Sequence, residues 1–119
     1  MTPPEVVVFC ESTEEVAFVV QQAAAAIQAA LARAGISPQD LALAEIMEAY
    51  AVQAMACVAG AGLDPARVNL GGGSWARGHP IGASGAILAV RLFYELQQGV
   101  GLAAIAAAGG VGTALLLAR

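Results

Sequence analysis

The sequence has no lysine and few charged residues of any kind. Of its 119 residues, 12% are charged and 59% are hydrophobic, and the formal net charge is -4. Five arginines against nine acidic residues make no basic surface for nucleic acid, and the high apolar content excludes a disordered chain. The length predicts one domain. Because so few charged side chains cover a small domain thinly, we expect another chain to bury apolar surface here.

Cysteine and histidine are also scarce. Cys10 and Cys57 are too few for a disulfide framework, and they lack the spacing that would make a metal site with the single histidine, His79. No basic segment precedes an apolar run, as it would in a signal peptide. No apolar run of membrane-spanning length is free of Gly, Pro or charge. We therefore expect a cytoplasmic protein that binds no metal, no membrane and no nucleic acid.

Short strands and helices alternate in the predicted secondary structure. Strands are expected over residues 6–9, 41–46, 67–70, 102–107 and 113–117. Helices are expected over residues 12–34, 48–61 and from about 86 to 98, with a single helical turn at 37–40. Ser12 and Glu15 form a candidate capping box, and Gly35, Gly62 and Gly99 are candidate helix ends. The order indicates an α/β domain in which helices are layered on a sheet.

Residues 71–85 form a glycine-rich segment around His79. An imidazole is suited to moving protons near neutral pH, and neighbouring glycines let a ligand approach the backbone closely. The alternative is a histidine that only hydrogen-bonds its own loop. The segment has neither the P-loop pattern nor the dinucleotide fingerprint. Four of the five arginines lie in residues 67–119, which could reflect an anionic ligand near this half.

Residues 69–85 closely resemble the signature of the thiolase family, Asn-x-x-Gly-Gly-x-x-x-x-Gly-His-Pro-x-Gly-Ala-Ser-Gly. Residues 45–51 are similar to the family's Glu-Ile-Asn-Glu-Ala-Phe-Ala, and residues 101–112 to its closing Gly-rich segment. The resemblance covers nearly all of the chain but only about the last third of a full family member. It implies that residues 1–119 are a thiolase-like C-terminal domain, an α/β half with a mixed five-stranded sheet and packed helices.

The resemblance also implies a function for His79. In the family this histidine activates a nucleophilic cysteine and helps to form an oxyanion hole for an acyl thioester. That cysteine belongs to the first half, which we expect on a separate chain because Met1 is followed almost at once by the first strand. A hetero-oligomer such as a dimer of heterodimers would result. Coenzyme A thioesters would be the substrates, with no further cofactor. The implied lining of the pocket is Met47, Glu48, Gly78, Ala106, Ala108 and Gly109.

Three positions depart from the family pattern. Met47 replaces an Asn that anchors a water, Ala106 replaces an acid/base cysteine, and Ala108 replaces a Gly whose N–H serves an oxyanion hole. Cys57 does not restore the thiol and is expected to be a small core residue.

Three functions remain open. The chain could be the catalytic C-terminal subunit of a two-chain enzyme that forms or cleaves a C–C bond at a 3-oxoacyl thioester. It could be a degenerate subunit that completes the fold and pocket of an active partner, or an interaction module without a ligand. The intact Gly-His-Pro motif favours the first over the third, and the three replacements favour the second.

Overall fold

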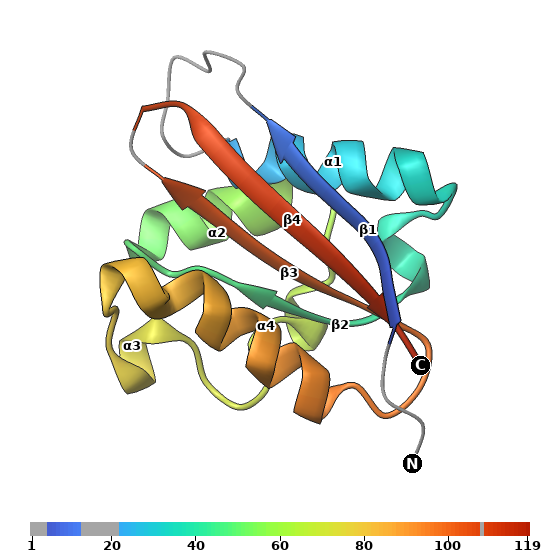
Figure 1. The fold of residues 1–119 in the computed structure, drawn as a ribbon. Coiled ribbons are helices and arrows are strands. Elements are labelled where there is room, and N and C mark those ends of the chain that lie inside the picture. The colour runs from blue at the N-terminus through green and yellow to red at the C-terminus, as the bar shows by residue number, and fades with distance from the viewer. Residues whose placement is uncertain (1–4, 13–21, 108) are drawn as a thin grey trace.

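A computed structural model describes residues 5–12, 22–107 and 109–119 of the chain. At its centre lies a mixed sheet in which four strands follow the order β1-β4-β3-β2 (Figure 1). These strands are β1 (Glu5–Ser12), β2 (Leu41–Ile46), β3 (Val100–Ala107) and β4 (Val111–Ala118). β2 and β3 pair in parallel, whereas β4 pairs antiparallel with both β3 and β1. The α/β class expected from the sequence is confirmed.

The expected five-stranded sheet is wrong for the described residues. The segment predicted as a strand at 67–70 makes a single parallel bridge, between Ala44 and Val68, and no continuous ladder. Arg67 ends a short 3-10 turn, and Asn69 has a positive φ of 51°. A left-handed residue breaks the extended backbone that a longer strand would need, so the fifth strand is reduced to one bridge.

Helices cover the two faces of the sheet unequally. α1 (Gln22–Ala34) and α2 (Ala51–Gly60) lie on one face, while α4 (Ser84–Glu95) lies on the other with the short α3 (Ser74–Arg77) beside it (Figure 1). Three 3-10 turns complete the described elements, at Pro38–Asp40, Pro65–Arg67 and Ile81–Ala83. Within the described part of the chain, no helix is long and apolar enough to cross a membrane.

The core consists of two clusters, one on each face of the sheet. The α1-side cluster joins α1, α2 and three strands, and its fully buried members include Ile27, Cys57 and Leu116. The α4-side cluster is smaller. Its buried members are Leu43, Met47, Leu88, Leu92, Leu96, Ala103 and Leu117. Strand alternation explains this split, because successive side chains of β3 and β4 enter opposite clusters.

Two predicted helices begin or end at other residues. Ser12 pairs with Gly112 in β1, so the first helix does not start there, and Glu15 of the expected capping box lies outside the described residues. α4 ends at Glu95 rather than near residue 98, because Leu96 turns to an extended conformation and is fully buried.

The second helix also starts later than expected, at Ala51 instead of residue 48. The N–H of Met47 still donates to the Ala104 carbonyl at 2.9 Å, so the backbone follows the sheet beyond β2. The side chain of Gln53 then accepts from the Ala49 N–H at 3.2 Å. Met47 and Glu48 therefore lie on the connection between strand and helix, not on α2.

Candidate active site

His79 lies on an exposed turn between α3 and α4. Gly78, which ends α3, has φ 88° and ψ 172°, a conformation that favours glycine. Its N–H donates to the Ser74 carbonyl at 2.7 Å, which closes the short helix. The chain then continues through Pro80 into the 3-10 turn and α4. The sequence thus places an imidazole at the surface of the turn, where a ligand or partner can reach it.

Ser84 is the side-chain partner of His79. Its Oγ lies 2.7 Å from His79 Nδ1, and Ser84 itself is 4% exposed at the start of α4. Of the two neutral tautomers, the one that carries its proton on Nδ1 donates to the Ser84 hydroxyl and leaves Nε2 with a free lone pair. This contact orients the ring, and in that tautomer Nε2 is left to accept a proton from outside the pair.

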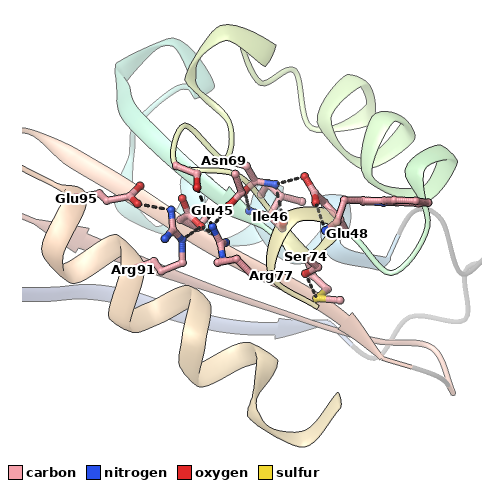
Figure 2. A network of polar contacts seen from close by, with 12 residues as sticks. Glu45, Ile46, Glu48, Asn69, Ser74, Arg77, Arg91 and Glu95 are labelled. Atoms are coloured by element: carbon pink, nitrogen blue, oxygen red, sulfur yellow. Dashed lines mark hydrogen bonds and ion pairs between the residues drawn. The ribbon is translucent and has the colours of Figure 1, made fainter. Parts of the chain in front are cut away.

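Glu48 is half-buried where the chain leaves β2, and its carboxylate is fully engaged. Oε1 accepts from Asn69 Nδ2 at 2.7 Å and Oε2 accepts from the Trp75 N–H at 3.1 Å (Figure 2). A Cβ at Gly73 would overlap this carboxylate, so only glycine at this position leaves room for the Glu48 side chain. Glu48 therefore ties the end of β2 to α3, and a structural role accounts for its contacts.

Asn69 also holds the end of β2, through hydrogen bonds with the backbone of Ile46. Its Oδ1 accepts from the Ile46 N–H at 2.7 Å and its Nδ2 also donates to the Ile46 carbonyl at 3.0 Å. These hydrogen bonds satisfy backbone groups at the end of β2, as a continuous fifth strand would have done. Asn tolerates the left-handed backbone that Asn69 adopts better than most residues.

The remaining predicted pocket residues are spread over the site region. Met47 is 1% exposed, and its Sδ receives a hydrogen bond from Ser74 Oγ at 3.5 Å. Ala106 is half-buried at the end of β3 and packs against the α1-side cluster. Gly109 is exposed with φ 92°, in the turn before β4, and Ala108 lies outside the described residues. The roles of these residues in a pocket with His79 stay predictions.

A buried ion-pair network connects β2, α3 and α4. Glu45 on β2 is fully buried, and its Oε2 lies 3.0 Å from Arg91 Nε and 3.7 Å from Arg77 Nη2 (Figure 2). Arg91 also pairs with Glu95 on α4. Burial raises the pKa of the Glu45 carboxyl above its usual range, while the hydrogen bond and charge of Arg91 oppose that rise.

The arginines of the second half are engaged within the chain. Arg77 and Arg91 join the network, and Arg67 pairs with Asp64 at 3.5 Å and donates to the Leu41 carbonyl at 2.7 Å. Arg119 donates to the Leu96 carbonyl at 2.7 Å. The uneven charge along the sequence thus reflects internal pairing and carbonyl contacts, and does not by itself indicate an anion site.

Cys57 is fully buried on α2, and burial raises the pKa of its thiol to about 11. A protonated, inaccessible thiol is a poor nucleophile and acid/base group near neutral pH. The expectation that Cys57 is a core residue is confirmed.

Two neighbouring hollows lie between Glu48 and α2. The larger, of about 370 Å³, is lined by Glu48, Asn69, Val68 and apolar residues that include Met55 and Leu63. The smaller, of about 270 Å³, includes Trp75. His79 does not line either of these two hollows.

Several residues of the site were not singled out from the sequence. Asn69 and Ser84 lie inside the quoted signature without an assigned role, and Glu45, Arg77 and Arg91 are separated by up to 46 positions. The spacing of five between His79 and Ser84 across a Pro-Ile-Gly turn is a usable signal. The ion pairs depend on tertiary contacts and leave no local pattern.

Comparison with known proteins agrees with this arrangement. Residues 4–119 match the family described as "Thiolase, C-terminal domain". The chain is 46% identical over 101 residues to a probable acetyl-CoA acetyltransferase of Mycolicibacterium smegmatis, covering 82% of this chain and 26% of that protein. The chain thus spans about a quarter of the length of this relative.

Solved structures show the same similarity at the level of the fold. The Acat5 thiolase of Ascaris suum, solved in complex with coenzyme A, matches with a TM-score of 0.93 and 36% identity, over 100% of this chain and 31% of that one. The peroxisomal 3-ketoacyl-CoA thiolase of Saccharomyces cerevisiae matches with a TM-score of 0.92 and 30% identity, over 98% of this chain and 34% of that one. That yeast protein is described as five layers built from two core domains of identical topology.

Proposed function

Since the chain belongs to the thiolase family, in which it matches the C-terminal domain, we propose that it is the C-terminal subunit of a two-chain thiolase-like enzyme. The enzyme acts on acyl-CoA thioesters by acyl transfer and forms or cleaves the C–C bond of a 3-oxoacyl-CoA. Coenzyme A arrives as part of the substrate, and no further cofactor takes part. We expect the assembly to work in the cytoplasm.

His79 is the candidate catalytic residue. With its Nδ1–H donating to Ser84 Oγ, 2.7 Å away, the free Nε2 accepts the proton of a cysteine thiol. The thiolate attacks the thioester carbonyl, the bond from carbon to the sulfur of coenzyme A breaks, and the proton on His79 goes to the departing coenzyme A thiolate. The intact turn around an exposed, oriented imidazole is the observation that carries this proposal.

The nucleophilic cysteine comes from a first-half domain on a partner chain. An incompletely covered apolar face on this chain supports such a partner. On α4, Val90 and Tyr94 are 55% and 72% exposed, and a hollow of about 390 Å³ lies between this helix and the β4 residues Leu115 and Leu117. The two-domain description of the yeast thiolase indicates what could cover that face. A dimer of such heterodimers is the assembly we expect.

A second candidate is a non-catalytic subunit that completes the fold and pocket of an active partner. Met47 favours it, because its side chain is buried and its sulfur already contacts Ser74, so it does not replace an amide that holds a water. Ala106 also favours it, because a methyl group has no ionisable proton and cannot act as an acid or a base. Loss of a general acid/base group costs about 10²–10⁴-fold in rate.

Substitution of His79 tests the proposal. In the complex with its partner, His79→Ala should slow acyl transfer and iodoacetamide alkylation of the partner cysteine by at least ~10²-fold while leaving assembly intact. Gln98→Ala is the control, because Gln98 is exposed in the turn after α4. Unchanged alkylation and turnover in His79→Ala would favour the non-catalytic subunit.

Exchange of the α-protons of acetyl-CoA separates the two chemical steps. Acylation needs His79 and the partner cysteine, whereas carbanion formation needs the acid/base group that Ala106 lacks. We expect measurable acyl loading with slow exchange, and at least ~10-fold faster exchange in Ala106→Cys. Rapid exchange in the unsubstituted complex would show that another group has taken over this role, and an acidic or thiol side chain of the partner would be the first candidate.

A further inference from the structure

The turn that carries His79 has little burial of its own. Every residue from 75 to 83 is exposed. Ser84 ties the turn to α4 on the C-terminal side of His79. On the N-terminal side, two residues before His79, Arg77 turns its side chain inward.

Arg77 connects this exposed turn to the interior of the domain. Its Nη1 donates to the carbonyl of Gly71 at 3.1 Å and also to that of Gly72. Its Nη2 lies 3.7 Å from Oε2 of Glu45, which is fully buried on β2 (Figure 2). One guanidinium thus joins the glycine-rich segment, the end of α3 and the central sheet.

Arg91 holds the carboxylate of Glu45 from α4. Arg91 Nε is 3.0 Å from Glu45 Oε2, and the Arg91 guanidinium also pairs with Glu95. A Cβ at Gly71 would overlap the guanidinium of Arg91, so the glycine makes room for the network. The Glu45 carboxylate, to which Arg77 is anchored, is therefore positioned by its own strand, β2, and by Arg91 of α4.

Stability alone is a weak reason for this network. Removing charges from water is expensive, and buried ion pairs are often no better for stability than apolar side chains of similar volume. Glu45 Oε1 has no hydrogen-bond partner among the described residues. What the network does supply is a defined position for Arg77, because a guanidinium fork bonded to two carbonyls and a buried carboxylate has little freedom.

We propose that Arg77 is a positioning residue for His79 and that the buried Glu45 carboxylate holds it in place. The inference rests on the proposed function, since the position of His79 matters for catalysis only if His79 activates a thiol. A displacement of about 1 Å in a catalytic group can reduce the rate about 10²-fold. Release of Arg77 would allow such a displacement in a turn that is otherwise exposed.

The test uses Arg77→Met in the complex of this chain with its partner. Methionine keeps an unbranched side chain, and Arg91 continues to pair with Glu45, so the fold should persist. Arg77→Lys is the conservative variant that restores the charge. The matched control is Arg67→Met, because Arg67 also donates to two backbone carbonyls and pairs with an acid, Asp64, in another part of the chain.

Two measurements are made on each variant. For Arg77→Met we expect kcat for acyl transfer to fall about 10²-fold while KM changes less than about threefold, since a transition-state contact is lost and substrate binding is not. Amide hydrogen exchange over residues 72–84 should rise at least ~10-fold, because local opening becomes easier. Arg77→Lys should recover part of both effects, and Arg67→Met should show neither.

Each contrary outcome overturns a different claim. Unchanged exchange over residues 72–84 in Arg77→Met would show that Arg77 does not anchor the turn. Raised exchange with unchanged kcat would show that the anchor does not position His79. If the unsubstituted complex has no acyl transfer, the proposed function and the positioning role both fail, and the exchange result alone then decides whether Arg77 anchors the turn.

Discussion

The two faces of the sheet differ in how far this chain covers them. On the α1 side, two helices enclose a cluster in which Ile27, Cys57 and Leu116 are completely buried. On the α4 side, one long helix packs mainly on β2 and β3, and apolar side chains on its outer surface, including Val90 and Tyr94, stay exposed. The α1-side cluster is closed inside the domain, although α2 also exposes Val52 and Met55. The α4 side differs in having a hollow of about 390 Å³ between its helix and β4, and it resembles an interface.

The partner that we propose for the α4 side would account for the small number of charged residues in the sequence. A domain that covers its own apolar side chains presents polar groups on all sides, whereas a subunit needs them only on its free surface. His79 lies beside the start of α4, so a partner that covers the α4 side would also approach the imidazole. Assembly and catalysis would then depend on the same face.

A charge introduced on the α4 side of the domain should have the largest effect, and the effect should be on assembly. We expect Val90→Glu to prevent co-purification with the first-half partner, because an unpaired carboxylate would be buried in the interface. Gln98→Glu, in an exposed turn, should leave assembly unchanged. Pull-down of the tagged partner measures both. Normal recovery of Val90→Glu would place the interface elsewhere.

A matched pair of truncations measures how much each face contributes to stability. Ile27→Ala on the closed face should lower the free energy of unfolding by about 2–5 kcal/mol, because it leaves a cavity in a packed core. Val90→Ala should change the stability of the domain itself by about 0.5 kcal/mol or less, because Val90 is exposed within this chain. Urea unfolding of the complex at several protein concentrations separates the two effects, because only the interface contribution depends on concentration. Equal costs would contradict the assignment of faces.

The buried thiol of Cys57 gives a smaller effect that depends on pH. Its pKa of about 11 exceeds the reference value of 9.0 because of burial, so the folded state keeps the proton longer than the unfolded state. This contribution to stability is complete below pH 9 and is lost as pH rises toward 11. Between pH 8 and pH 11, the parent should lose about 2 kcal/mol more than Cys57→Ala. Parallel urea titrations would contradict this if the two proteins lose stability equally.

Local features of the fold could be predicted well from the sequence. β2 occupies the expected residues 41–46, and Gly35, Gly62 and Gly99 all adopt positive φ near the ends of helices or turns. Such features depend on neighbours in sequence. The fifth strand and the start of α2 could not be predicted in this way, because tertiary hydrogen bonds from Asn69 and to the Ala104 carbonyl decide them.

The candidate site likewise has a part that the local sequence predicts and a part that depends on tertiary contacts. A long motif led to His79 and its turn, and this identification needed no tertiary information. The roles of Glu45 and Arg77 became visible only in the fold, because β2 and α3 are separate in sequence and meet across the glycine-rich segment. That Met47 and Ala106 replace the family's Asn and Cys can be seen in the sequence alone. The structure adds that Met47 is buried and contacts Ser74.

Native mass spectrometry of the chain, expressed alone and together with its first-half partner, shows directly whether the chain is a subunit of a two-chain enzyme. We expect the chain alone to be recovered mainly as aggregate, and co-expression to give a complex with equal numbers of the two chains. A stable, well-behaved monomer of this chain alone, with the outer surface of α4 open to solvent, would contradict it.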